Sequence, residues 1–351
     1  MIPPSRIWAP LLAGVSMLVE QVQQPVFRGR IETVAVPVSV FDTQGELVTE
    51  LKREDFTVLD NGRPQAITTF SSGLQPLRAV AFVDVSASMM PSINLAQLAA
   101  EQFVIRLNPD DKAKVGRFSD RIEISPEFTA DRDRLLTWIR RDLPFSNPTR
   151  LLDAIDAGIT ELLLETGRRV VVVFTDGCDT ASDMRWPKLL NRIRAEDVMV
   201  YAVIFKPHII VTAPPERSLS FGSARRMPGR SSSPPLACTL HHHLELSNAS
   251  SPKDFLNIDD PRWTRGAGLL TELASETGAG RLQLTSSDDV NSLFTSVMRE
   301  LHYLYLLGFT AQTLDGKVHD LTVRVKNPKL VVRARQHFLA RLPDGVDPAH
   351  R

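Results

Sequence analysis

The sequence predicts an α/β protein built on a doubly wound, mostly parallel central sheet with helices on both faces. Short apolar runs such as VVVVFT at 170–175 alternate with segments of helical periodicity, which is typical of strands buried on both faces. The two flanks of the chain instead alternate apolar and polar residues with no helix between the strands. We therefore expect an α/β domain accompanied by a small antiparallel β unit.

The N-terminal flank, residues 23–75, is predicted to be a β segment with turns at 42–45 and 60–62. A strict alternation places four valines on one face of its first strand: Val34, Val36, Val38 and Val40. A unit of this size is too small for an independent core. We therefore expect it to pair with the C-terminal segment 303–340.

That C-terminal segment carries predicted strands at 303–310, 321–326 and 330–335, followed by a tail at 341–351. Asp315 and Gly316 form a dipeptide that favours tight turns, so the sequence predicts a hairpin between the first two of these strands.

Residues 76–302 are predicted to form the α/β domain. Its strands are expected at 78–84, 114–118, 170–175, 198–205 and 281–284, and its helices at 92–107, 131–140, 150–165, 187–196, 269–276 and 289–301. Residues 207–262 interrupt the pattern, because 8 Pro and 9 Ser among 56 residues leave no periodicity. This stretch is predicted to be a disordered insertion.

The N-terminus carries the signals that bear on the cellular compartment. Arg6 precedes an apolar run at 7–19, which is too short to span a bilayer but has the length of a secretory signal. Residues 1–22 are therefore predicted to be a signal peptide or a short anchor, with a packed N-terminal segment as the alternative. The expected localisation is extracytoplasmic: periplasmic, secreted or cell-surface. In an exported chain Cys178 and Cys238 could pair, although their spacing does not require it.

Oxygen-bearing side chains cluster where predicted strands end, which is the ligand-binding edge of an open α/β sheet. Carboxylates and hydroxyls suit Mg²⁺, Mn²⁺ or Ca²⁺ better than zinc. Taken singly, each residue could instead be a helix cap or part of a turn. Taken together, they predict a metal site formed by Asp84, Ser86, Ser88, Thr149 and Asp176.

This arrangement resembles the metal-ion-dependent adhesion site of von Willebrand factor A domains, with a D-x-S-x-S loop, a later threonine and T-D-G. Roughly residues 26–340, apart from the insertion, resemble the bacterial proteins called VWFA-related, common in acidobacteria. The stretches that carry this resemblance are VFRGR near 26, EDFTVLDNGRPQAI at 54–67 and YLLGFT…DGKVHDLTVRV at 305–325.

The resemblance implies a role for each of the five residues. Ser86 and Ser88 would bind the metal directly. Asp84 and Asp176 would bind it directly or through water, and Thr149 would do either, depending on the conformational state. The resemblance also implies that a carboxylate from a partner protein fills a remaining coordination position.

The expected function is therefore metal-dependent, adhesion-type protein binding, with no enzymatic activity. The sequence shows no phosphate-binding G-x-x-x-x-G-K-[ST] loop, no G-x-G-x-x-G after a strand and no G-x-S-x-G nucleophile turn. A metal-dependent hydrolase and a cytoplasmic assembly or chaperone-like factor are the alternatives. The 41 basic and 41 acidic residues balance, which disfavours a nucleic-acid partner. The identity of the partner and the oligomeric state stay open.

Overall fold

The computed structural model describes residues 33–141, 145–205 and 261–342, with side chains described from 266 onward in the last range. The predicted signal peptide or anchor at 1–22 and Cys238 lie outside these ranges, as do most of the predicted insertion and of the tail. Within the described ranges, no helix combines the length and the apolar character needed to cross a membrane.

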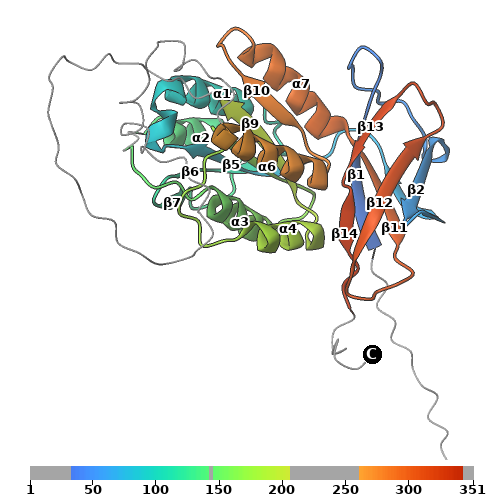
Figure 1. Cartoon of the computed structure of the whole chain (residues 1–351). Coiled ribbons are helices and arrows are strands. Elements are labelled where there is room, and N and C mark those ends of the chain that lie inside the picture. The colour runs from blue at the N-terminus through green and yellow to red at the C-terminus, as the bar shows by residue number, and fades with distance from the viewer. Residues whose placement is uncertain (1–32, 142–144, 206–260, 343–351) are drawn as a thin grey trace, which may run out of the picture. The chain divides into compact units, whose positions relative to one another are not determined.

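Six strands form the central sheet in the order β10-β9-β8-β5-β6-β7. All of them except β8 are labelled in Figure 1. The first five are mutually parallel, and the short edge strand β7 is antiparallel to β6. The strands are β5 (Leu77–Asp84), β6 (Lys112–Phe118), β7 (Ile122–Ile124), β8 (Arg168–Thr175), β9 (Met199–Phe205) and β10 (Arg281–Leu284). This order confirms the doubly wound fold and puts its switch point between β5 and β8.

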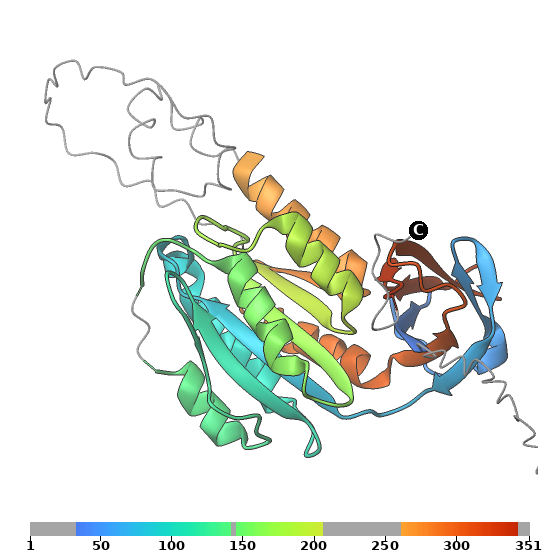
Figure 2. The ribbon, with the colours of Figure 1, turned by 90° about the horizontal axis from the view of Figure 1, so that it is seen from below.

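Helices cover both faces of this sheet, and Figure 2 shows the same layers from a second direction. One face packs against α1 (Ile93–Ile105), α2 (Arg132–Ile139) and α7 (Val290–Tyr303), and the other against α3 (Leu151–Leu162), α4 (Trp186–Ala195) and α6 (Pro261–Thr277). Successive residues of β8 enter opposite cores, because side chains alternate along a strand. Val172 joins the first core and Val173 the second, which explains the uninterrupted apolar run.

The two flanks of the chain pair into an antiparallel unit, as the sequence predicts. One sheet has the order β13-β1-β11-β4 and the other β14-β12-β2-β3, so each contains strands from both flanks. A single apolar core containing the four alternating valines joins the two sheets. The strands are β1 (Thr33–Phe41), β2 (Phe56–Asp60), β3 (Arg63–Gln65), β4 (Ile67–Ser71), β11 (Tyr305–Thr310), β12 (Val318–Val325), β13 (Val331–Ala334) and β14 (His337–Leu339).

The prediction of a hairpin at Asp315 and Gly316 is wrong. β11 pairs with β1 and β4, whereas β12 pairs with β2 and β14 in the other sheet. Gly316 does turn the chain with a φ of 75°, but its N–H donates to the Ala340 carbonyl at 2.7 Å. The turn residues therefore mark a crossing between sheets rather than a local pairing.

The start predicted for the fifth helix is also wrong. α6 begins at Pro261, not near 269. Gly266 and Gly268 weaken the helical pattern of its first half, because glycine lowers intrinsic helix propensity. In this part of the helix, Ala267 joins the second core and Gly266 approaches Gly177, which is next to a residue of the predicted metal site.

Candidate metal centre

The site begins where β5 and β8 end side by side. These strands pair in parallel up to Val83 and Phe174, so the next residues, Asp84 and Thr175, are neighbours. The Thr175 hydroxyl donates to Asp84 Oδ2 at 2.6 Å, although 91 positions separate them in the sequence. The sheet edge at the switch point thus holds a fully buried carboxylate.

The D-x-S-x-S residues form a tight loop after β5. Asp84 Oδ1 accepts a hydrogen bond from the Ser86 N–H at 2.9 Å, and the Ser86 and Ser88 hydroxyls are 3.1 Å apart. Ser86 precedes the 3-10 helix at Ala87–Ser92, yet its side chain makes no capping hydrogen bond. The helix-cap alternative therefore does not account for Ser86, whose hydroxyl lies beside that of Ser88.

Asp176 follows Thr175 and is almost entirely buried. Its Oδ1 accepts a hydrogen bond from the Cys178 N–H at 3.0 Å, which makes a local turn. Its Oδ2 is buried and has no hydrogen-bond partner among the described residues. A buried carboxylate oxygen without a partner is costly, so this atom points to a ligand.

Thr149 lies on a third loop, which contacts the other two. Its N–H donates to the Thr180 hydroxyl at 2.8 Å, and its carbonyl accepts from the Thr180 N–H at 2.9 Å. Earlier in the same loop, Ser146 makes a bridge with Ser86. The buried Thr149 is thus joined to the site through its neighbours, whereas Asp84, Ser86 and Ser88 are joined by direct hydrogen bonds.

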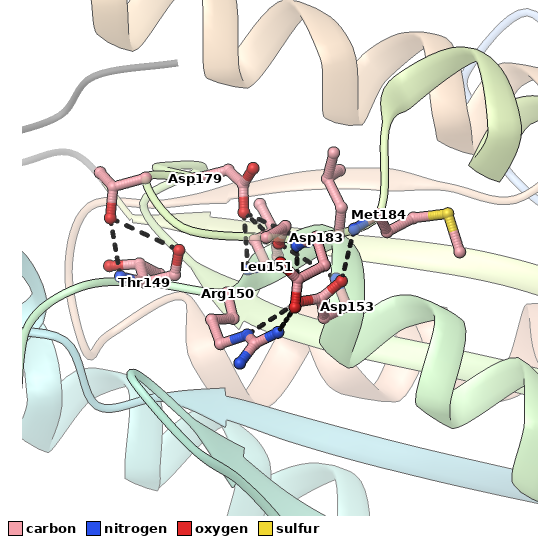
Figure 3. Close-up of polar contacts among 10 residues, drawn as sticks. Thr149, Arg150, Leu151, Asp153, Asp179, Asp183 and Met184 are labelled. Carbon is pink, nitrogen blue, oxygen red and sulfur yellow. Dashed lines mark hydrogen bonds and ion pairs between the residues drawn. The ribbon is translucent and has the colours of Figure 1, made fainter. Parts of the chain in front are cut away.

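Thr149 does not cap the helix that follows it. The N-cap residue of α3 is Arg150, which makes no side-chain cap. Asp179 performs this role from a distance, because its Oδ1 accepts a hydrogen bond from the Leu151 N–H at 2.9 Å (Figure 3). Burial raises the pKa of Asp179, and a hydrogen bond from Ser182 opposes that rise. The loop after β8 is therefore anchored to the start of α3.

A second carboxylate on α3 holds the far end of that loop. Asp153 accepts hydrogen bonds from the Met184 N–H at 2.8 Å and the Asp183 N–H at 3.0 Å. It also pairs with Arg150 at 2.7 Å (Figure 3). Asp153 and Asp179 thus both join the start of α3 to the loop after β8.

The electrostatics of the site favour a cation. Burial, together with repulsion from Asp176, raises the pKa of Asp84 to about 7, against hydrogen bonds from Ser86 and Thr175. Burial also raises the pKa of Asp176, and the Ser88 hydroxyl opposes this rise. Two neighbouring buried carboxylates are stabilised by a proton or by a positive ion between them.

The residues present fit a hard divalent ion. Asp176 Oδ2 needs a partner, and the other candidate donors are carboxylate and hydroxyl oxygens. Such donors suit Mg²⁺, Mn²⁺ or Ca²⁺. Among the described residues, His, Cys, Asp and Glu nowhere gather in a group of three or more that could hold a metal. A centre here therefore depends on the serine and threonine hydroxyls as well as on its two carboxylates.

Two residues that support the site, Thr175 and Gly266, were not predicted from the sequence. Thr175 contacts Asp84, and its place in the T-D-G motif is the one sequence feature that could have indicated this role. Gly266 of α6 approaches the backbone of Gly177, which adopts a left-handed φ of 86°. A Cβ at Gly266 would lie 2.3 Å from the Gly177 carbonyl oxygen. No local pattern reveals a contact between residues so far apart.

Cys178, next in this loop, is disulfide-bonded. The one other cysteine of the sequence is Cys238, outside the described residues.

Comparison with known proteins identifies the region that contains this site. The family model described as von Willebrand factor type A domain matches residues 80–178. The matched segment includes all five predicted metal-binding residues. A search of curated proteins finds no match.

Several solved structures share similarity with the chain at low identity. An aerotolerance-related membrane protein from Bacteroides fragilis is 15% identical, with a TM-score of 0.42, covering 64% of this chain and 98% of its own. BatB from Bacteroides thetaiotaomicron is 13% identical, with a TM-score of 0.41 and the same coverages. Proximal thread matrix protein 1 from mussel byssus, described with a zinc-occupied MIDAS motif, is 14% identical with a TM-score of 0.43, covering 69% of this chain and 49% of its own. These similarities are too weak to indicate a shared function.

Proposed function

We propose, from the premise that the chain carries a von Willebrand factor type A domain, that it is a metal-dependent binding protein. Asp84, Ser86, Ser88, Thr149 and Asp176 would hold a divalent cation, Mg²⁺ by preference. The cation would bind a carboxylate of a partner protein. The observation that carries this proposal is the buried Oδ2 of Asp176, which has no partner among the residues that the structure describes, beside a second buried carboxylate.

Charge balance explains why an acidic partner group would bind there. A divalent ion offsets the charges of Asp84 and Asp176, so its site has little excess negative charge and can accept another carboxylate. Mg²⁺ keeps several water ligands when proteins bind it, and a partner carboxylate could replace one of them.

We propose binding rather than catalysis for this site. The donors are suited to holding an ion, and hydrogen bonds within the loops fix both oxygens of Asp84 and Oδ1 of Asp176. The neighbouring Cys178 is disulfide-bonded and therefore carries no free thiol that could act as a nucleophile.

We also propose an extracytoplasmic location, supported by the apolar run at 7–19 and by the disulfide bond of Cys178. Disulfides persist mainly in oxidising compartments. Fractionation of the native host tests this directly, and a cytoplasmic protein would instead support the assembly-factor alternative.

Calorimetry with Mg²⁺ tests the metal site. Asp84→Asn keeps the shape of the side chain but removes its charge, so we expect Mg²⁺ affinity to fall by about 100-fold or more, beyond the 10–100-fold typical of outer-shell changes. Asp183→Asn is the matched control, because this carboxylate is 90% exposed on the neighbouring loop. Equal Mg²⁺ binding by the wild type and Asp84→Asn would refute the proposal.

A further inference from the structure

Two large apolar side chains are exposed on the loops that carry the metal site. Met90 follows Ser88 by two residues and is 54% exposed. Phe145 is 37% exposed and precedes Ser146, the residue that bridges to Ser86. Met90 lies in the 3-10 helix at Ala87–Ser92 and Phe145 in the loop before Thr149, and the bridge between Ser86 and Ser146 joins these two segments. We call Met90 and Phe145 the apolar rim.

Several charged groups on the neighbouring loops contact one another within the chain. Arg121 lies 3.9 Å from Asp120, and Asp120 itself contacts Ser146. Arg150, next to the buried threonine of the site, lies 2.7 Å from Asp153. A partner arriving here would therefore meet a bound cation beside uncovered apolar surface.

We infer that the partner's acidic side chain is flanked by large apolar residues, and that the apolar rim covers them when the cation binds the acid. This inference rests on the proposed function and narrows the class of ligand from any exposed carboxylate to an acidic–apolar segment. Burying one large side chain is worth roughly a tenfold or larger gain in affinity. The apolar rim would thus give higher affinity to acidic ligands with apolar flanks, whereas the cation alone would bind all acidic ligands with similar affinity.

Immobilised synthetic peptides measure this preference with the full-length protein in solution and Mg²⁺ present. The probes are GGLDFGG, its polar counterpart GGSDSGG and its uncharged counterpart GGLNFGG, displayed at equal density. We expect GGLDFGG to bind at least tenfold more tightly than GGSDSGG. We expect GGLNFGG not to bind above background, and EDTA to abolish the binding of both acidic peptides.

Variants of the rim assign the preference to these side chains. The double variant Met90→Ser/Phe145→Ser should bind both acidic peptides with equal affinity while its Mg²⁺ binding stays unchanged. Leu164→Ser is the matched control, because Leu164 is 94% exposed after the far end of α3. It should keep the full preference, and thermal melts should show all three proteins folded.

The experiment distinguishes a failure of this inference from a failure of the proposed function. Mg²⁺-dependent binding of GGLDFGG and GGSDSGG with equal affinity would overturn the inference and leave the proposed function standing. A preference that persists in the double variant would also overturn it. Absence of Mg²⁺-dependent binding to any acidic peptide would overturn the inference and count against the proposed function as well.

Discussion

The close approach of α6 to the loop after β8 allows a test of how packing supports the proposed metal site. A Cβ at Gly266 would lie 2.3 Å from the Gly177 carbonyl oxygen and 2.9 Å from its carbonyl carbon. A Cβ at Gly268, two residues further along the same helix, would meet nothing within 4 Å. Alanine at these two positions therefore makes a matched pair that differs in what the added methyl group touches.

The size of the effect follows from these distances. An ordinary contact begins near 3.4 Å, so Gly266→Ala forces a movement of about 1 Å between α6 and Gly177. Overpacking of this kind costs roughly 1–3 kcal/mol, while both alanines gain about 0.5–1 kcal/mol of helix propensity. The unfolding free energy of Gly266→Ala should therefore be about 1–3 kcal/mol below that of Gly268→Ala.

The same movement reaches Asp176, which is adjacent to Gly177. We expect Gly266→Ala to weaken Mg²⁺ binding by about tenfold or more, in the range seen when the supports of metal ligands are disturbed. Denaturant unfolding in EDTA gives the stability difference, and calorimetry with Mg²⁺ gives the affinity. If both alanine variants had equal stability and equal affinity for Mg²⁺, the reasoning from this contact would be refuted.

Two further predictions concern the carboxylate at the end of β5. Thr175→Val leaves Asp84 Oδ2 without its donor, so stability should fall by about 1–3 kcal/mol and Mg²⁺ affinity by roughly 10–100-fold, whereas Thr175→Ser should retain both. The raised pKa of Asp84 means that the folded, metal-free protein keeps a proton that the unfolded chain releases between pH 3.8 and about 7. Its unfolding free energy should therefore fall as pH rises through this window, by on the order of 4 kcal/mol from this group. Urea titrations in EDTA across that range should show the fall in the wild type, and a fall of the same size in Asp84→Asn would contradict the assignment.

The fold was predictable where periodicity and burial agree. β8 shows this clearly, because Val172 and Val173 belong to cores on opposite faces of the sheet and no polar residue interrupts the strand. The pairing of the two flanks followed from their size, since neither could bury a core alone. The route of the chain between sheets was not predictable, because Asp315 and Gly316 indicate that the chain turns but not which strand it meets next.

In the candidate site, too, the local features were predictable from the sequence and the contacts between distant segments were not. The D-x-S-x-S loop and T-D-G are local patterns, so the sequence alone indicates Asp84, Ser86, Ser88 and Asp176. Their supports depend on contacts between distant segments. Asp179 caps a helix 28 residues earlier in the chain, and Gly266 packs against the loop from a helix far beyond it. No periodicity or motif encodes such pairs.

The position of the site follows from the strand order rather than from its loops alone. β5 and β8 are neighbours in space because the chain winds first through β6 and β7 on one side and then returns to the other. Their register places Asp84 beside Thr175, and a slip of one residue would turn one of these side chains to the opposite face of the sheet. That register is fixed by the apolar side chains of both strands, packed into two cores. The same burial that stabilises the sheet therefore brings the two carboxylates together, where a cation can offset their repulsion.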